Sequence, residues 1–374
     1  MITLNFFGDF IASSEERLSM DEALRKHISV ADLNIINFEA PAVSANCFDP
    51  TIKSGPVLCQ SPDSPSWLEE NGFDVVSLAN NHIMDYGTNG LYETKKAFEK
   101  SLTVGAGSWE EAYKPVIVEV KAKKIAIFAL SQLEFGNLAD EWDVSSKDGV
   151  AWINHPKVDV TIQQTRQKAD YLIVYAHAGL EHAEQPLPEW RDRYRQLIDM
   201  GCDAVIASHP HIAQGWEYYH GCPIVYSLGN FYFSALTGKS SSWYRSLCAS
   251  LFIEDRKISI NMTPLQFSKK GISVCHEEEF AKYLTRVNEV LSDSNAYMTY
   301  VNGKCQELES SYYSSFVKSG LGRILNWRDT KSYLGLRLRN PSSLSVAPLL
   351  NMIRCETHRW CLLRAMKLKN KEIL

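Results

Sequence analysis

Up to about residue 230, the sequence alternates short runs of β-branched and aromatic residues with amphipathic stretches, a pattern typical of strands separated by helices. The predicted strands cover residues 3–7, 33–37, 74–78, 124–130, 171–176, 204–207 and 223–227. Several of these runs are apolar at every position, which predicts a sheet covered by helices on both faces. The pattern therefore predicts an α/β fold.

Two amphipathic stretches are expected to form covering helices. Residues 91–100 follow Thr88, whose side chain can cap a helix, and residues 189–200 carry an apolar stripe that ends before Gly201. Residues 43–66 are rich in Pro, Ser and Asp and lack periodicity, so we expect a long loop there. Loops of that length are commonly functional or mobile, which makes this one a candidate flap beside a substrate.

The pattern changes after about residue 240. Residues 247–254 and 258–266 are expected to form two further strands, and residues 277–291 a helix. From about residue 295 the chain is polar and then helical. We therefore expect a first domain over residues 1–275 and a mainly helical C-terminal extension over residues 276–374.

The last predicted helix is basic and amphipathic, and such a helix can lie on an anionic membrane surface or bind a partner. The alternative, which we favour, is that its apolar stripe packs on the main domain or on a second subunit. The stripe is formed by Val346, Leu349, Leu350, Ile353, Trp360, Cys361 and Leu368, and the basic residues are Arg354, Arg359, Arg364, Lys367, Lys369 and Lys371.

The composition is that of an ordinary globular protein. Among 374 residues, 45% are hydrophobic and 22% are charged, which excludes wholesale disorder, a collagen repeat and a coiled coil. The formal net charge of −5 argues against nucleic acid as a partner. The longest apolar runs, such as residues 125–130, are about a third of the length that a bilayer crossing requires, so no membrane span is expected.

The N-terminal residues and the cysteines bear on the compartment. The first residues lack the basic stretch and cleavage site of a secretory signal, so a cytoplasmic location is expected. The nine cysteines include no CxxC pair. We expect reduced and mostly buried thiols rather than a disulfide framework.

Side chains of metal-binding type recur just beyond the carboxyl ends of the predicted strands. Ligands of open α/β sheets bind outside these ends, so five loops are predicted to converge on one site. Each residue alone is weak evidence, because a lone Gly-Asp is usually a turn and a lone histidine is usually structural. The residues are Asp9, Asn37, Glu39, Asn80, Asn81, His82, His177, His209 and His211.

The types of these side chains indicate a divalent metal. Carboxylate, amide oxygen and imidazole together suit Mn, Fe, Zn or Mg, whereas a structural zinc site would need clustered thiols. The sequence therefore predicts a catalytic site for one or two divalent ions. Such an ion lowers the pKa of bound water and neutralises charge on a phosphoryl or carbonyl oxygen.

Several short motifs occur in order over about residues 1–235. They are Gly8-Asp9, Asn37-Phe38-Glu39-Ala40-Pro41, residues 74–82 with Asp85 and Gly87, His177-Ala178-Gly179-Leu180-Glu181, Gly201-Cys202-Asp203, His209-Pro210-His211, Gln214, Glu217 and residues 226–231. Through this highly specific combination the chain resembles the poly-γ-glutamate capsule synthesis protein family, often called CapA, a branch of the calcineurin-like metallophosphoesterases.

The resemblance implies a four-layer α/β/β/α sandwich with a metal centre at one sheet edge. It implies His82 as the general acid, and Asp85 either orients His82 or is an ordinary turn-forming residue. The metal ligands that it implies are Asp9, Glu39, Asn81, His177, His209 and His211, with Glu39 at the position of the bridging carboxylate.

The chain departs from the family pattern at three positions. Ile11 stands where the wider superfamily has a metal-binding histidine, so single or asymmetric metal occupancy is expected. Ala178 and His182 stand where the family commonly has bulky aromatic residues, which predicts an altered pocket. His182 is either an additional ligand or acid, or a surface histidine, and we favour the latter.

Three further residues near the motifs are open to two interpretations. Glu181 is either an acceptor for a ligand imidazole or a loop carboxylate. Ser227 and Asn230 could suggest a nucleophile, but no Gly-x-Ser-x-Gly sequence surrounds Ser227. We interpret these two as scaffold at the end of the sheet.

The leading functional prediction is a metal-dependent hydrolase of phosphate esters or a related anionic linkage. The resemblance places it in bacterial capsule or cell-surface polymer biosynthesis, with an anionic small molecule or polymer precursor as substrate. One alternative is a non-catalytic capsule-assembly accessory protein that retains the metal fold. Another is a metal-dependent amide or peptide hydrolase, because the same metal chemistry attacks carbonyl groups.

Overall fold

The computed structural model describes residues 1–13, 18–139, 148–234, 239–255, 257–269, 271–318 and 347–369. The chain forms two compact units, which are residues 1–51 with 57–294, and residues 52–56 with 295–374. The first unit includes the helix α7 (Glu278–Ser292). The expected domain division after residue 275 stays a prediction.

The first sheet of the larger unit has the order β17-β16-β15-β1-β2-β3-β4, and β14 also pairs with β1. Strands β1 to β4 and β14 pair in parallel, and β15 to β17 add an antiparallel side. The bounds are β1 (Ile2–Ile11), β2 (Leu33–Phe38), β3 (Val75–Ser77), β4 (Leu102–Val104), β14 (Asn230–Phe233), β15 (Arg245–Glu254), β16 (Lys257–Ser268) and β17 (Gly271–Val274).

The second sheet has the order β12-β13-β11-β10-β7-β6, with parallel inner strands and antiparallel edges. Its bounds are β6 (Val116–Val120), β7 (Lys123–Ser131), β10 (Tyr171–His177), β11 (Ala204–Ser208), β12 (Trp216–Tyr219) and β13 (Cys222–Val225). A small third sheet joins β5 (Ala106–Ser108), β9 (Asp148–Ala151) and β8 (Asn137–Leu138).

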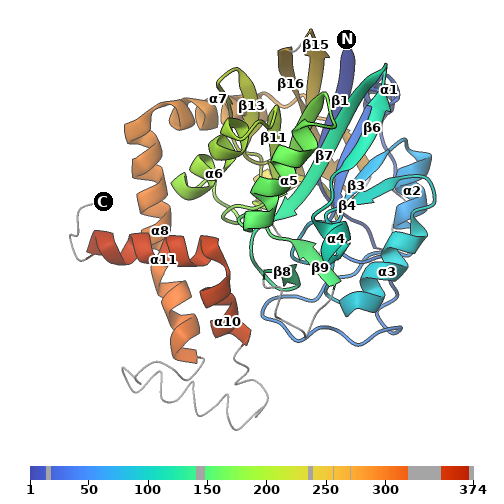
Figure 1. The fold of residues 1–374 in the computed structure, drawn as a ribbon. Coiled ribbons are helices and arrows are strands. Elements are labelled where there is room, and N and C mark those ends of the chain that lie inside the picture. The colour runs from blue at the N-terminus through green and yellow to red at the C-terminus, as the bar shows by residue number, and fades with distance from the viewer. Residues whose placement is uncertain are drawn as a thin grey trace. The chain divides into compact units, whose positions relative to one another are not determined.

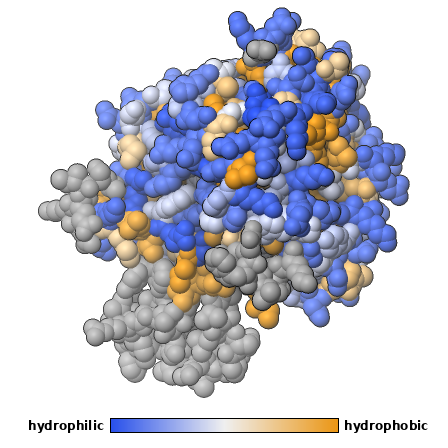
Figure 2. All heavy atoms as spheres, viewed as in Figure 1, coloured by the Kyte–Doolittle hydropathy of each residue, from blue (hydrophilic) through white to orange (hydrophobic). Residues whose placement is uncertain are grey.

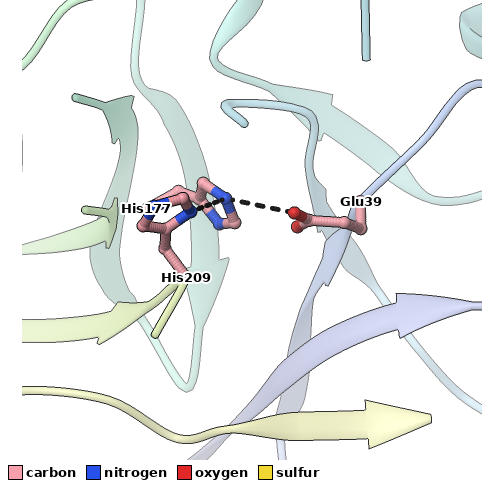
Figure 3. A group of neighbouring side chains, drawn as sticks. All are labelled: Glu39, His177 and His209. Atoms are coloured by element: carbon pink, nitrogen blue, oxygen red, sulfur yellow. Dashed lines mark hydrogen bonds and ion pairs between the residues drawn. The ribbon is translucent and has the colours of Figure 1, made fainter. Parts of the chain in front are cut away.

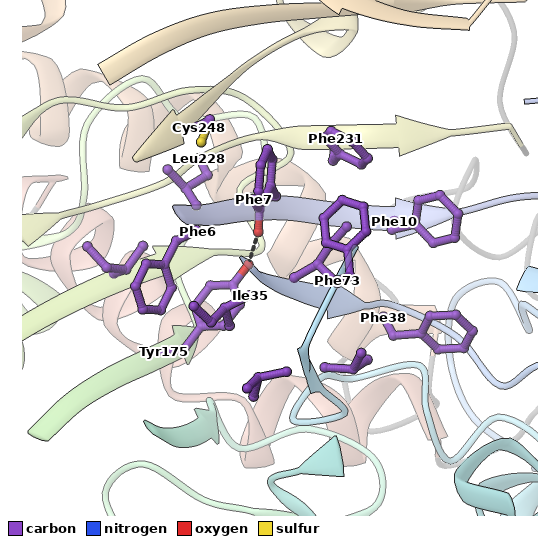
Figure 4. Packing of buried hydrophobic residues seen from close by; sticks show 14 of the residues in the cluster. Phe6, Phe7, Phe10, Ile35, Phe38, Phe73, Tyr175, Leu228, Phe231 and Cys248 are labelled. Carbon is purple, nitrogen blue, oxygen red and sulfur yellow. Dashed lines mark hydrogen bonds between the residues drawn. The ribbon is translucent and has the colours of Figure 1, made fainter. Parts of the chain in front are cut away.

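The two large sheets pack face to face through an aromatic core. The rings of Phe6 in β1 and Tyr175 in β10 lie 5.7 Å apart, and the Tyr175 hydroxyl donates to the carbonyl of Phe7 (Figure 4). Phe10 stacks on Trp67 of the helix α2 (Ser64–Glu70), at a centroid distance of 5.5 Å. The first sheet is therefore buried on both faces, by the second sheet and by helices.

Helices cover the outer side of each large sheet. The outer side of the first sheet is covered by α1 (Glu22–Ser29), α2 and α3 (Gly87–Ala97). The outer side of the second sheet is covered by α5 (Pro156–Arg166) and α6 (Pro188–Asp199) (Figure 1). A short helix, α4 (Trp109–Ala112), contacts the third sheet. The predicted four-layer α/β/β/α arrangement is confirmed.

Most predicted elements lie within a few residues of the observed ones. The helices predicted at 91–100 and 189–200 are α3 and α6, and residues 43–63 form mainly loop before α2. The pattern did not predict the edge strands β6 and β12, whose side chains are largely half-exposed or exposed. All nine cysteines lie among the described residues as thiols rather than disulfides, and six of them are buried, as expected.

The smaller unit is helical, as predicted for the C-terminal extension. Its helices are α8 (Ser294–Lys318), α10 (Ala347–Arg354) and α11 (Glu356–Lys369), and Lys369 Nζ lies 3.1 Å from Glu309 of α8. The predicted apolar stripe is divided, because Leu349 and Cys361 are buried whereas Leu350 and Ile353 are exposed. Val346 and Lys371 lie outside the described residues.

The face shown in Figure 2 is mostly hydrophilic, with scattered hydrophobic residues. Among the residues that the structure describes, no helix has the length and apolar character that a membrane crossing needs. A membrane contact of the C-terminal helices stays a prediction.

Candidate metal centre

Asp9 is presented by a β-bulge near the end of β1. The register of β1 against β2 shifts between Phe7 and Asp9, and Asp9 N donates to the carbonyl of Gly229 at 3.0 Å. Gly8 is needed at this point because a Cβ there would lie 1.8 Å from Gly229 O. Bulges of this kind change the direction of the side chains that follow them, and here the Asp9 carboxylate is fully buried.

Asn37, at the end of β2, links two carboxylates of the site. Its Nδ2 atom lies 2.8 Å from Asp9 Oδ1 and 2.5 Å from Glu39 Oε2. All three side chains are 1% exposed or less. One amide group therefore donates to two buried carboxylates and keeps them side by side.

The turn after β3 is tied to the end of β2 by Asn80. Asn80 Nδ2 donates to the Phe38 carbonyl at 2.7 Å, and Asn80 Oδ1 accepts from the backbone N–H groups of His82 and Ile83. An asparagine that binds the backbone two and three residues ahead stabilises a tight turn. The turn brings Asn81 and His82 to the same sheet edge as β2.

The three histidines come from neighbouring strands of the second sheet. His177 ends β10, and His209 and His211 follow the adjacent strand β11. His209 and His211 have φ angles of +100° and +61°, a region that non-glycine residues rarely adopt and that is found mainly at functional sites. Their ring centroids lie 6.0 Å apart, so this strained turn keeps both imidazoles at one edge.

Glu39, His177 and His209 form the centre of the cluster. One potential ligand atom from each of them lies within 4.8 Å of the other two (Figure 3). His177 Nε2 lies 3.2 Å from Glu39 Oε1, 3.0 Å from His209 Nδ1 and 3.0 Å from Asn81 Oδ1. Four groups from four different loops thus converge on one point between the two sheets.

Asp9 and His211 adjoin this point. Asp9 Oδ2 lies 3.4 Å from His211 Nδ1, and Asp9 Oδ1 lies 3.6 Å from His177 Nδ1. The structure therefore brings together all six residues that the resemblance implies as ligands. Their roles in metal binding stay predictions.

The ionisable side chains of the site shift one another's pKa values. Burial opposes ionisation of Asp9, but the imidazoles of His177 and His211 outweigh it and hold the pKa of Asp9 well below its usual range. Burial likewise opposes protonation of His177, but Glu39 and Asp9 raise its pKa to about 10. In His211, the effect of Asp9 outweighs burial and raises the pKa to about 9.

The pKa of His209 shifts in the opposite direction to those of His177 and His211. Burial and the charge of the neighbouring His177 lower the pKa of His209 well below its usual value. Imidazolium groups thus balance the carboxylates in the metal-free site, and His209 is available as a neutral ligand. A bound cation would replace these protons, because metal ligands must be deprotonated.

The site fits a divalent cation. Glu39 is fully buried, and its Oε1 atom faces His177 Nε2 at 3.2 Å and has no well-aligned hydrogen-bond donor among the described residues. A buried carboxylate oxygen without a hydrogen bond is costly unless a cation or another donor satisfies it. The donor set of carboxylate, amide and imidazole suits Mn, Fe, Zn or Mg.

His82 and Asp85 form a buried pair beside the cluster. His82 Nδ1 lies 2.7 Å from Asp85 Oδ2, and their side chains are 9% and 1% exposed. Asp85 Oδ2 also accepts from Leu58 N at 2.7 Å, and the Asp85 carbonyl accepts from Thr51 N at 2.8 Å. Asp85 therefore contacts His82 and also holds the long loop that was predicted as a flap.

Two residues that depart from the family pattern, Ile11 and His182, lie in different environments. Ile11 is 1% exposed and pairs with Phe233 in the β1–β14 ladder, so an apolar core residue stands at that position. His182 is exposed, and its ring lies 5.5 Å from that of Trp243 and 6.2 Å from that of His211.

Glu181, Ser227 and Asn230 also lie near the site. Glu181 is exposed, with His209 and His211 among its charged neighbours. Ser227 Oγ accepts from Gly229 N, and Asn230 Oδ1 lies 2.9 Å from His211 Nδ1. The contact of Asn230 agrees with a scaffold role beside a proposed ligand.

Sequence reasoning missed Gln132 and Glu134, which also reach the site. Gln132 Nε2 lies 2.8 Å from His209 Nε2, and Glu134 Oε2 accepts from Asn81 Nδ2 at 3.3 Å. Both residues directly follow β7, whose core was predicted at residues 124–130. The rule that located the other loops at strand ends would also have indicated this one.

The sequence model of the bacterial capsule synthesis protein family PGA_cap matches residues 8–235, which include every proposed ligand. The chain belongs to this family. The resemblance inferred from the motifs is therefore confirmed. The matched part contains most strands of both large sheets, and α8, α10 and α11 lie outside it.

Named relatives of this chain include two Bacillus proteins. It is 29% identical to the PGA biosynthesis protein CapA of Bacillus subtilis over 66% of this chain and 64% of the relative. It is 30% identical to the capsule biosynthesis protein CapA of Bacillus anthracis over 44% of this chain and 41% of the relative. The chain thus spans less than two thirds of each relative.

Among solved structures, a putative 5'-nucleotidase from Staphylococcus aureus is similar, with 13% identity and a TM-score of 0.45. The similarity covers 76% of this chain and 58% of that chain.

Proposed function

We propose that this protein is a metal-dependent hydrolase of phosphate esters or a related anionic linkage, acting in capsule or cell-surface polymer biosynthesis. The observation that carries the proposal is the convergence of Glu39, Asn81, His177 and His209 on one buried point, with the His82–Asp85 pair beside it. The pathway is suggested by the names of the two CapA relatives.

The proposed ligands would hold one or two divalent ions. The group formed by Glu39, Asn81, His177 and His209 supplies the more complete set, and Asp9 with His211 supplies the adjoining one. Because Ile11 contributes no donor, the second position is expected to bind more weakly. A divalent ion held by these residues would lower the pKa of bound water and would neutralise charge on a phosphoryl oxygen.

The side chains of this protein perform the remaining steps. Asp85 holds Nδ1 of His82, which leaves Nε2 of His82 to donate a proton to the leaving oxygen. Asn37 keeps the Asp9 and Glu39 carboxylates together, and the aromatic core excludes water behind the site. An anionic small molecule or a polymer precursor is the proposed substrate.

A second candidate function is that of an accessory protein without catalysis. Ile11 removes one donor from the set, and a Mycobacterium tuberculosis relative, 29% identical over 56% of this chain, is named a probable polyglutamine synthesis accessory protein. Such a protein would use the centre to bind a polymer or a partner enzyme. A cytoplasmic location also stays a prediction.

The decisive experiment uses the full chain after tag removal. Metal content is measured by elemental analysis, and hydrolysis of an aryl phosphate and of a γ-glutamyl amide is followed with Mn²⁺. We expect bound metal and phosphate-ester hydrolysis that is lost in His82→Ala with the metal content unchanged. A chain that binds no divalent ion contradicts the proposal, and amide hydrolysis alone would indicate the amidase alternative.

A further inference from the structure

The loop after β7 places a buried carboxylate against the proposed ligand Asn81. Glu134 Oε2 accepts from Asn81 Nδ2 at 3.3 Å, and Glu134 Oε1 accepts from Gln132 Nε2 at 2.5 Å. Glu134 is 8% exposed, and Asn81 and Gln132 are 7% and 1% exposed. Each carboxylate oxygen therefore accepts a hydrogen bond from one amide nitrogen.

Gln132 keeps this carboxylate in place. Its backbone N–H donates to the His177 carbonyl at 3.0 Å, and its Oε1 accepts from Gly179 N at 3.1 Å. With the oxygen engaged, the Gln132 amide nitrogen faces Glu134 Oε1 at 2.5 Å and His209 Nε2 at 2.8 Å. The loop after β7 is thus fixed to the end of β10, where the proposed ligands meet.

The atom of Asn81 that faces away from Glu134 is the one that converges on the centre. Asn81 Oδ1 lies 3.0 Å from His177 Nε2. An amide carries its oxygen and its nitrogen on opposite branches. Holding the nitrogen of Asn81 therefore determines that its oxygen faces the centre.

We propose that Glu134 is a positioning residue of the metal centre, which orients Asn81 so that Asn81 Oδ1 faces the ion. This inference rests on the proposed metal centre and adds a residue that is not one of its ligands. A carboxylate suits the role because it offers two acceptor oxygens, one for Asn81 and one for Gln132. Acceptors of this kind fix the orientation of ligand side chains and raise metal affinity.

Glu134→Gln is the informative substitution. The amide has the shape of the carboxylate but only one acceptor oxygen, so it cannot accept from both Asn81 and Gln132. The Mn²⁺ affinity of the metal-free full chain, measured by calorimetry, is expected to fall about 10–100-fold. The visible spectrum of the Co²⁺-loaded protein should also change, because a reoriented ligand alters the coordination geometry.

Glu119→Gln is the control. It removes an exposed carboxylate of the edge strand β6, which lies opposite Lys124 and belongs to no part of the proposed site. We expect no more than about a threefold loss of Mn²⁺ affinity, since exposed charges interact weakly through solvent. An equal loss in both variants would overturn the proposal, because removal of negative charge alone would then explain it.

The remaining outcomes separate this inference from the proposed function. If wild-type protein binds Mn²⁺ and folded Glu134→Gln binds it equally well, the positioning role is wrong while the metal centre stands. If wild-type protein binds no metal, the proposed function itself fails. Should Glu134→Gln not fold, Glu134→Asp takes its place; its shortened side chain should weaken Mn²⁺ binding, and unchanged binding would refute the role.

Discussion

His82 Nδ1 lies 2.7 Å from the Asp85 carboxylate, and both side chains are buried at the turn that follows β3. The sequence left two roles open for Asp85, as an orienting partner of His82 or as a turn residue. The side-chain contact agrees with the orienting role, and the bond to Leu58 N shows that the same carboxylate also holds the neighbouring loop.

Asp85→Asn should lower the turnover of an aryl phosphate while Mn²⁺ affinity stays close to that of wild type. The amide no longer fixes the orientation of the His82 ring as the carboxylate does, and general acid catalysis as a whole contributes typically 10²–10⁴-fold. We expect a loss smaller than that of His82→Ala, mainly in kcat. Equal activity of Asp85→Asn and wild type at all pH values would contradict the orienting role.

Metal binding should strengthen as pH rises from 7 towards 10. The pKa of His177 is raised to about 10 and that of His211 to about 9 in the metal-free protein, so a cation must displace protons from both. Calorimetry of Mn²⁺ binding in buffers with different ionisation enthalpies should show proton release at pH 7. An affinity that does not change with pH would show that these imidazoles are not displaced by the ion.

Glu217→Gln should destabilise the fold without a direct effect on the metal centre. Glu217 accepts from Arg191, Arg195 and Tyr226, and these partners outweigh burial and lower its pKa to about 2. Loss of this charged acceptor should cost on the order of 2 kcal/mol in the free energy of unfolding at pH 7. Urea denaturation of the metal-free protein measures it.

The effect of Glu217 on stability has a defined pH dependence. The folded pKa is lower than the unfolded value of 4.5, so its contribution is present above about pH 4.5 and is lost as pH falls towards 2. The difference between wild type and Glu217→Gln should therefore shrink below about pH 4.5. If the difference in the free energy of unfolding between wild type and Glu217→Gln were constant from pH 7 to pH 3, the negative charge of Glu217 would not be what stabilises the fold.

Gly8→Ala should weaken both the fold and the metal centre. The new Cβ would lie 1.8 Å from Gly229 O, so the bulge that presents Asp9 must shift. We expect at least about 2 kcal/mol of destabilisation in urea and a lower Mn²⁺ affinity. The control is Gly303→Ala in α8, where nothing lies within 4 Å of the new Cβ and a stabilisation of about 0.5–1 kcal/mol is expected.

Hydrophobic periodicity was sufficient to predict the inner strands and the main helices from the sequence. Strands β7, β10 and β11 are apolar runs because helices and a second sheet cover both of their faces, and burial of this kind leaves a local signal. The edge strands β6 and β12 gave no such signal, because their side chains are largely half-exposed or exposed. The bulge at Gly8 depends on Gly229, which lies far along the chain.

The amino-acid sequence determined which donors stand at the ends of the strands, because strand ends can be located from local patterns and the motifs occur in order. Only the tertiary structure decided that Asn37 joins two carboxylates, that Ile11 lies in the core and that Glu134 accepts from both Asn81 and Gln132. These contacts depend on how two sheets pack, and packing between distant segments leaves no periodic trace in the sequence.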